Sequence, residues 1–238
     1  LGIVQEEMGL HDEAIATYKS LLDINPDNLN VLQHLVQIYL QQQEYDEALP
    51  LLKGLKEKGI GGLETSRKIG LIYLESERYD DAIAEFREIL EREPNALQIR
   101  FYLATAYEEK EEYGRALEEF GRIPPGSFNY FEAVGHMAFI HKDMGNPEKG
   151  IAVLKDAIAA YPSHLELHLY LAGLYESLDH YTEGLAVLKA VEGEFGGDPR
   201  LHFRMGTLYD KMGNKDESIA RMKKVLTIAP DEIGRAHV

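Results

Sequence analysis

The segment RYDDAIAEF, residues Arg78–Phe86, recurs in altered form elsewhere in the chain. Related phrases are YDEALPLL, which begins at Tyr45, and HDEAIATY, which begins at His11. The alanines of the three phrases recur at one constant interval, at Ala14, Ala48 and Ala82. Further steps of the same length reach only small side chains, which are those of Ala116, Gly150, Gly184 and Ser218. Self-similarity at a fixed period of roughly 20–50 residues is typical of stacked repeat architectures.

Each repeat carries the pattern of two short helices. In Ala82–Leu90 the apolar residues recur with helical spacing and form one stripe of an α-helix, which Pro94 stops. The preceding segment Ile69–Tyr73 has the same character, and the polar stretch ESERYD separates the two. The sequence therefore predicts an all-α fold of antiparallel helix pairs, whose small residues let the backbones approach closely. Three turns within pairs have a glycine suited to a left-handed conformation: Gly9, Gly145 and Gly213.

This pattern resembles that of the tetratricopeptide repeat family, W-x2-L-G-x2-Y…A-x3-F…P, which recurs about every 34 residues. Two repeats match it well, one through IGLIY (Ile69–Tyr73), Ala82, Phe86 and Pro94, the other through MGTLY (Met205–Tyr209), Met222 and Pro230. The chain has no tryptophan, and the place of the family's tryptophan is taken by Leu32, Ser66, Arg100, Val134, His168 and His202. The resemblance implies a right-handed α-solenoid of about 6.5 to 7 helix-turn-helix units.

The resemblance also predicts where the repeats lie. A partial repeat at residues 1–28 is followed by repeats at residues 29–62, 63–96, 97–130, 131–164, 165–198 and 199–231. The tail EIGRAHV, residues 232–238, fits no repeat and resembles the translated read-through of a sequencing adapter, so we expect it not to be native. We interpret the chain as a metagenomic fragment of a bacterial multi-repeat protein, and the sequence leaves both the cytoplasm and the periplasm open as its location.

Two of the second helices are interrupted in the sequence. Pro50 lies inside one of them and removes a backbone hydrogen bond, at a cost of roughly 3 kcal/mol. Three glycines follow it, at Gly59, Gly61 and Gly62. The segment RIPPGS, residues Arg122–Ser127, cuts another second helix short. We expect a kink or looser packing at both junctions, with the register kept.

Composition and net charge exclude several classes of protein and of ligand. With 45% hydrophobic and 28% charged residues, the chain is typical of globular proteins. Its net charge of −16 repels phosphate backbones, so we do not expect nucleic acid as a ligand. The sequence predicts no transmembrane segment, because it has no run of 18 apolar residues. The absence of cysteine excludes disulfides and thiol chemistry.

The strongest candidate for a metal site is HLELH, because His164 and His168 at positions i and i+4 can both reach one ion. His202 lies one repeat after His168 in the same column. No third ligand is evident, however, and this column is where the family packs its tryptophan, so we interpret His168 and His202 as packing residues. The chain has no phosphate-binding loop or nucleophile elbow. We therefore predict that it is not an enzyme and needs no metal or cofactor.

The resemblance implies that the first helices line a concave face that holds an extended peptide or a helix. In the second repeat the inward-facing positions are Asn30, Gln33, Gln37, Leu40 and Gln41. Chaperone-binding members of the family clamp a C-terminal carboxylate with lysine and asparagine on this face. Other residue types stand at those places here, so we expect a basic or apolar ligand rather than an acidic one.

In the C-terminal half, bulky residues alternate with small ones on the same face. An aromatic ring beside a missing side chain makes a pocket, and each apolar anchor buried there contributes roughly 1.5–3 kcal/mol. The alternative is that these rings pack between neighbouring repeats or against a missing capping helix. The predicted groove residues are Gln33, Gln37, Arg67, Phe101, Thr105, Glu108, Gly135, Phe139, Leu169, Gly173, Phe203 and Thr207.

Three functions fit these features. The first is a non-catalytic scaffold that binds a peptide or helix of a partner protein in its groove. The second is a regulatory or substrate-docking arm of a larger enzyme. The third is a lipoprotein adaptor of the bacterial cell envelope, because the segment at residues 201–226 resembles the late repeats of such proteins.

Overall fold

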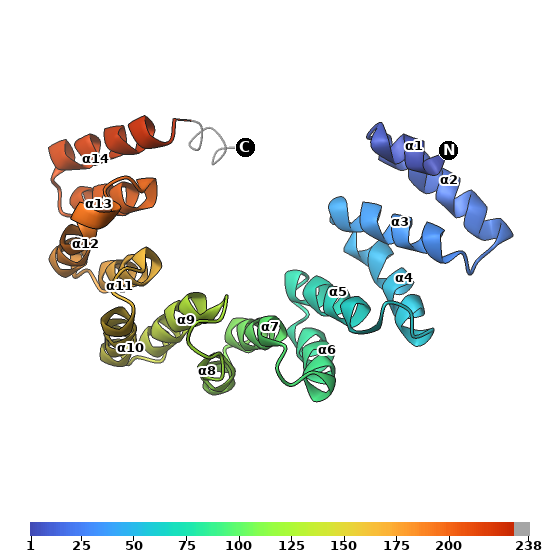
Figure 1. Cartoon of the computed structure of the whole chain (residues 1–238), viewed down its shortest axis with the longest axis horizontal. Coiled ribbons are helices and arrows are strands. Elements are labelled where there is room, and N and C mark those ends of the chain that lie inside the picture. Colours follow the sequence, from blue (N-terminus) through green and yellow to red (C-terminus); the bar gives the residue numbers. More distant parts are fainter. Residues whose placement is uncertain (231–238) are drawn as a thin grey trace. The chain divides into compact units, whose positions relative to one another are not determined.

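The computed structural model describes residues 1–230, and this part of the chain is built from α-helices without a β-strand (Figure 1). The predicted all-α fold is confirmed. None of the helices between residues 1 and 230 has the length and hydropathy of a membrane-spanning segment. The fourteen helices of the described residues are α1 (Gly2–Glu7), α2 (His11–Ile24), α3 (Leu29–Gln41), α4 (Tyr45–Glu57), α5 (Gly62–Glu75), α6 (Tyr79–Arg92), α7 (Leu97–Glu109), α8 (Tyr113–Gly121), α9 (Tyr130–Asp143), α10 (Pro147–Ala160), α11 (Leu165–Ser177), α12 (Tyr181–Phe195), α13 (Pro199–Lys211) and α14 (Lys215–Ile228).

The helices keep the step of the sequence repeat. The second helices of the pairs begin at the same constant interval as the alanines, at His11, Tyr45, Tyr79, Tyr113, Pro147, Tyr181 and Lys215. Neither interruption shifts this register. Helix α4 runs through Pro50, whereas α8 ends at Gly121 and has 9 residues against 14 in α10. The prediction that RIPPGS shortens a second helix is therefore confirmed.

The chain divides into two compact units, Leu1–Glu111 with helices α1 to α7 and Glu112–Val238 with helices α8 to α14. Within each unit, every helix packs against the next one along the chain. Consecutive first helices also contact each other, as α5 does with α7 and α9 does with α11. Each unit by itself thus has a surface formed by its first helices, which we call the first-helix face: α3, α5 and α7 in unit 1, and α9, α11 and α13 in unit 2.

Within each unit, small residues of two paired helices meet in the core, as α5 and α6 show. Ala82 of α6 is fully buried, and the ring of Phe86 occupies the space that a Cβ on Gly70 of α5 would need. Large side chains at the Phe86 position of other repeats are equally buried, namely Leu52, Phe120, Leu154 and Leu188. Burial of side chains of this size contributes about 1.5–3 kcal/mol each, and this packing rather than helix propensity stabilises the pairs.

The turn within each pair places one residue in the left-handed region. Glycine adopts it in three pairs, as predicted, with φ of 73°, 75° and 76° at Gly9, Gly145 and Gly213. In the other pairs a residue with a Cβ adopts φ between 57° and 61°, at Gln43, Glu77, Glu111 and Asp179. A side chain in this conformation costs roughly 1–2 kcal/mol. The backbone of the turn is therefore set by the packing of the pair, and not by glycine alone.

Replacing Gln43 or Glu77 by glycine is expected to raise the free energy of unfolding by about 0.5–1 kcal/mol. Relief of the left-handed strain exceeds the extra conformational entropy of glycine in the unfolded chain. Urea denaturation followed by circular dichroism measures the change. The matched control is the reverse substitution Gly145→Ala, which we expect to lower the free energy of unfolding by about 1 kcal/mol. A loss of stability in Gln43→Gly would contradict this account of the turn.

Candidate peptide-binding face

A cavity of about 550 Å³ lies between α3, α4 and α5, on the first-helix face of unit 1. Four of the five positions predicted to face inward in the second repeat line it: Gln33, Gln37, Leu40 and Gln41. We call it the α3–α5 cavity. Its other lining residues are Val36, Leu52, Leu55, Ile60, Gly61, Glu64, Thr65 and Lys68.

The α3–α5 cavity lies at the junction where Pro50 and the three glycines interrupt the repeat pattern. Gly61 has φ of 77°, and a Cβ on it would collide with the hydroxyl of Thr65, which donates a hydrogen bond to the carbonyl of Ile60 at 2.9 Å. This compact turn starts α5 at Gly62. A second cavity, of about 400 Å³, lies beside the RIPPGS segment. Both junctions thus contain open space, in agreement with the looser packing predicted there.

The lining of the α3–α5 cavity suits a polypeptide. Gln33 and Gln37 are exposed, and their amides carry the donors and the acceptor that pair with peptide N–H and C=O groups. Leu52 and Leu55 are buried and provide an apolar bottom. The lining has one carboxylate and one ammonium group, from Glu64 and Lys68, so its formal charge is balanced.

Arg67 acts on the α3–α5 cavity by binding the lining residue Glu64. Its Nε and Nη2 atoms donate to the two carboxylate oxygens of Glu64, at 2.8 and 2.6 Å. Hydrogen bonding by Arg67 is the main reason why the pKa of Glu64 lies below its ordinary value. The same bond raises the pKa of Arg67. Arg67 therefore orients a lining carboxylate and neutralises its charge.

The predicted residues of α7 lie on one face of that helix in unit 1. Phe101, Thr105 and Glu108 are half-buried and follow helical spacing. The ring of Phe101 meets the ring of Tyr102 edge-on, with centroids 6.3 Å apart. The hydroxyl of Thr105 donates to the carbonyl of Phe101 at 3.1 Å, within the same helix. Thr105 therefore offers a methyl group to a ligand more readily than a hydroxyl.

Gly135 in unit 2 does not leave an open pocket. A Cβ on Gly135 would lie 2.9 Å from the ring of Tyr170, so this tyrosine of α11 fills the space above the glycine of α9. The pocket predicted beside Gly135 is therefore closed. Tyr170 belongs to the next repeat, and the sequence did not predict it as a groove residue.

Gly173 lies between an aromatic ring and a cation. A Cβ on it would meet Phe139 Cζ at 3.7 Å and the guanidinium of Arg204 at 3.8 Å, which is ordinary contact distance. Phe139 and Leu169 are half-buried against the core clusters of unit 2, so both contribute to packing between repeats. Phe203 differs because 55% of it is exposed. The hydroxyl of Thr207 donates to the carbonyl of Phe203 at 3.1 Å, as Thr105 does in α7.

Three family models match the sequence, and each describes a tetratricopeptide repeat. They cover residues 7–59 and 142–202, residues 67–128, and residues 199–232. The chain belongs to the tetratricopeptide repeat family. Proteins of this fold present extended surfaces to other proteins, so its role is in protein–protein interaction. None of the curated proteins compared with the chain matches it.

Solved structures of other tetratricopeptide repeat proteins share the fold. A tetratricopeptide repeat protein from Parabacteroides merdae is 18% identical, with a TM-score of 0.65 over 98% of this chain and 92% of that one. The thermophilic protein TTC0263 from Thermus thermophilus is 24% identical, with a TM-score of 0.53 over 73% of this chain and 94% of that one. At these identities the likeness concerns the fold alone.

Two histidines stand in the tryptophan column of the tetratricopeptide repeat and make the same bond. His168 Nε2 lies 2.8 Å from the carbonyl of Pro162, and His202 Nε2 lies 2.8 Å from that of Gly196. Since a carbonyl only accepts, Nε2 carries the proton in both rings. His168 and His202 are buried, which agrees with the packing role predicted for them.

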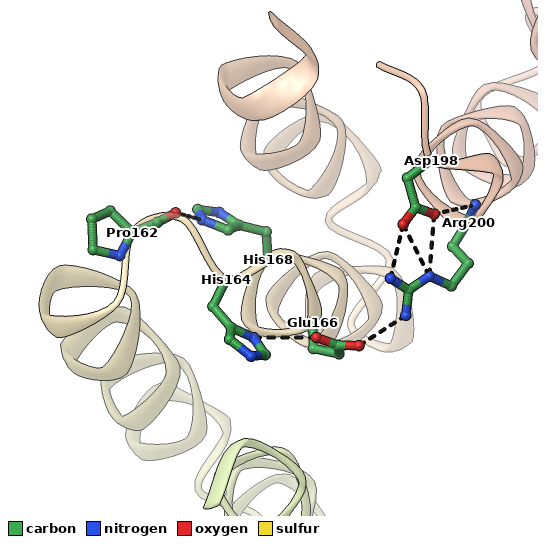
Figure 2. A network of polar contacts seen from close by, with 6 residues as sticks. All are labelled: Pro162, His164, Glu166, His168, Asp198 and Arg200. Carbon is green, nitrogen blue, oxygen red and sulfur yellow. Dashed lines mark hydrogen bonds and ion pairs between the residues drawn. The ribbon is translucent and has the colours of Figure 1, made fainter. Parts of the chain in front are cut away.

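His164 and His168 do not converge on one point. Figure 2 shows His168 directed to Pro162, whereas His164 Nδ1 lies 3.2 Å from Glu166 Oε2. The ring of His164 also stacks on Phe131, with centroids 3.4 Å apart. Between residues 1 and 230, no three histidine, aspartate or glutamate side chains are grouped as metal ligands.

An ion-pair network joins two first helices of unit 2. Arg200 of α13 donates to Glu166 of α11 at 2.8 Å, and it also binds Asp198 at the start of its own helix (Figure 2). These hydrogen bonds from Arg200 lower the pKa of Glu166 and of Asp198, and they raise the pKa of Arg200. Because Glu166 and Arg200 are 40% and 54% exposed, the pair stabilises the fold only modestly.

Five residues that complete the α3–α5 cavity, from α4, from the turn after it and from α5, were not predicted from the sequence. These are Leu52, Leu55, Ile60, Thr65 and Lys68. A signal for them existed, because Pro50 and the following glycines mark this junction as a place where a kink or looser packing is expected. Arg204 and Tyr170 each follow a predicted groove residue by one position, and no feature of the sequence indicated that they lie on this face.

Proposed function

We propose that this protein is a non-catalytic scaffold that holds an extended segment of a partner protein on its first-helix face. The observation that carries the proposal is the α3–α5 cavity in unit 1. Its volume of about 550 Å³ falls within the range of roughly 300–1,000 Å³ for ligand sites. It is also lined by residues that the family resemblance places on the binding face.

The chemistry of the cavity favours an apolar or basic segment. Gln33 and Gln37 lie one helical turn apart on α3, so their amides form a row that can pair with a peptide backbone. Buried Leu52 and Leu55 can receive an apolar side chain of the partner. Because the chain has a net charge of −16, an acidic segment would be repelled as it approaches the protein.

The first-helix face of unit 2 provides a second proposed binding site for the partner protein. Phe203 is exposed, and Gly173 lies beside the ring of Phe139 and the guanidinium of Arg204, which donates to Glu176 at 2.9 Å. An aromatic ring next to a cation suits an apolar or aromatic side chain of the partner. We include Phe139, Gly173 and Phe203 in the proposed binding surface, and we leave the closed space at Gly135 out.

A photo-cross-linking amino acid at Gln37 is expected to trap a partner protein from a lysate of the source cells. The same probe at Glu91, an exposed residue of the second helix α6, is the matched control and should trap none. The double variant Gln33→Ala and Gln37→Ala should bind the trapped partner about 30-fold more weakly, because two hydrogen bonds of about 1 kcal/mol each are lost. Equal trapping from Gln37 and Glu91, identified by mass spectrometry, would contradict the proposal.

A further inference from the structure

The cavity beside the RIPPGS segment lies in unit 2, between the second helices α8 and α10 and the first half of α9. It exists because Pro124 and Pro125 end α8 early, so no helical turn covers the adjacent part of α10. Its volume is about 400 Å³. We call it the α8–α10 cavity, and its lining residues are Phe120, Gly121, Ile123, Pro125, Tyr130, Ala133, Val134, Met137, Val153, Asp156 and Ala157.

The lining of the α8–α10 cavity is apolar except at one place. Asp156 of α10 is its single charged lining residue, and no ion pair engages Asp156 in the part of the chain that the structure describes. The acids nearby on α8 are occupied, because Glu118 and Glu119 both pair with Arg122, at 2.6 and 2.5 Å. Asp156 is therefore a carboxylate available to a ligand at an apolar cavity.

Tyr130 adds an aromatic surface to the same cavity. Its ring is half-buried and packs edge-on against Phe131 and Tyr161, at centroid distances of 5.3 and 5.8 Å. These contacts hold the ring in place, so its position does not depend on a ligand. A fixed aromatic ring and a carboxylate in one small cavity form the kind of surface that receives a cation with an apolar stem.

We propose that the α8–α10 cavity binds an arginine side chain of a partner protein. The methylene stem would contact Ile123, Val153 and Ala157, and the guanidinium would reach Asp156. Arginine fits better than lysine because its planar guanidinium pairs with a carboxylate through two hydrogen bonds and stacks on an aromatic ring. The cavity is too small for a helix, being at the low end of the range for ligand sites, which favours one anchoring side chain.

The test uses the whole chain and N-acetyl-argininamide as the probe, followed by chemical shifts of backbone amides in two-dimensional NMR. We expect saturable shifts at Gly121, Tyr130 and Asp156, with a dissociation constant of about 1–10 mM, as is usual for a single side chain. The citrulline analogue has the same shape without the charge and should bind at least about 10-fold more weakly. Equal binding of the two probes would overturn the proposal.

Two variants locate the site. Asp156→Asn removes the charge and should weaken binding of the arginine probe about 10-fold or more. Its matched control is Glu148→Gln, which removes one charge from an exposed position of the same helix and should leave binding unchanged. Equal losses in the two variants would mean that the probe responds only to the net negative charge, and the proposal would be wrong.

A third variant tests the cavity itself. Gly121 lines the cavity, and a Cβ on it meets no heavy atom within 4 Å, so Gly121→Leu can obstruct the cavity without a clash at the backbone. Leucine also suits this helical position better than glycine, which keeps the fold intact. We expect the loss of the probe-induced shifts in this variant, and undiminished shifts would overturn the proposal.

Discussion

Replacing His202 by alanine is expected to lower the free energy of unfolding by about 2–4 kcal/mol. The imidazole is fully buried, so its removal leaves a cavity. It also leaves the carbonyl of Gly196 without the donor that lies 2.8 Å away. Urea denaturation measures the total effect, and hydrogen exchange of α13 and α14 should show that the loss is local, because each repeat of a solenoid contacts mainly its neighbours.

The control for His202 is Arg100, which stands in the same column. Its guanidinium makes the equivalent bond, to the carbonyl of Pro94 at 2.7 Å, but this bond is exposed to solvent. Arg100→Ala should therefore cost only about 0.5–1 kcal/mol, since water replaces the lost donor. If His202→Ala costs no more than Arg100→Ala, the interpretation of His202 as a packing residue is wrong.

The substitution Gly150→Ala is expected to destabilise the protein by about 1–3 kcal/mol, although alanine is the better helix former. A Cβ on Gly150 would lie 3.1 Å from the carbonyl carbon of Ala138 in α9 and closer still to its oxygen. Both atoms belong to the backbone of a packed helix and cannot move aside as a side chain does. Helices α9 and α10 would have to separate, which opens the core around Leu154.

Gly184 provides the matched comparison, because it occupies the same column one repeat later. A Cβ on Gly184 would lie 3.1 Å from the carbonyl oxygen of Ala172, a contact that a small shift can relieve. The gain in helix propensity, about 1 kcal/mol, should then offset most of the strain. Thermal and urea unfolding of both variants measure the difference, and equal effects would mean that the clearance between paired helices does not decide this position.

The fold could be predicted from the sequence because its signals are local and repeated. The column of small residues through Ala82 and the large residues through Phe86 lie on the same helix or on the helix paired with it. The two helices of a pair lie within a single repeat, so the spacing of residues along the sequence indicates which side chains contact each other. The interruptions at Pro50 and at RIPPGS could also be predicted from the sequence, since proline lacks a backbone N–H and disrupts the helix in which it lies.

The binding face could be predicted only in part. Gln33 and Gln37 lie where the family resemblance places them, and they line a cavity. The pocket predicted beside Gly135 is closed, because Tyr170 enters it from the following repeat. Whether a missing side chain leaves a pocket depends on which neighbour is long enough to fill it, and the spacing of small residues does not contain that information.

By itself, the sequence determined that the chain is a series of helix pairs with a constant step, because helix periodicity, proline stops and small residues act over a few turns. The tertiary structure alone decided which side chains line the open space at the two interrupted junctions. The α3–α5 cavity needs side chains from three helices and a glycine turn, and the Glu166–Arg200 pair joins residues from two successive repeats. Such features depend on the packing of one repeat on the next, where a change of one side chain fills a space or leaves it open.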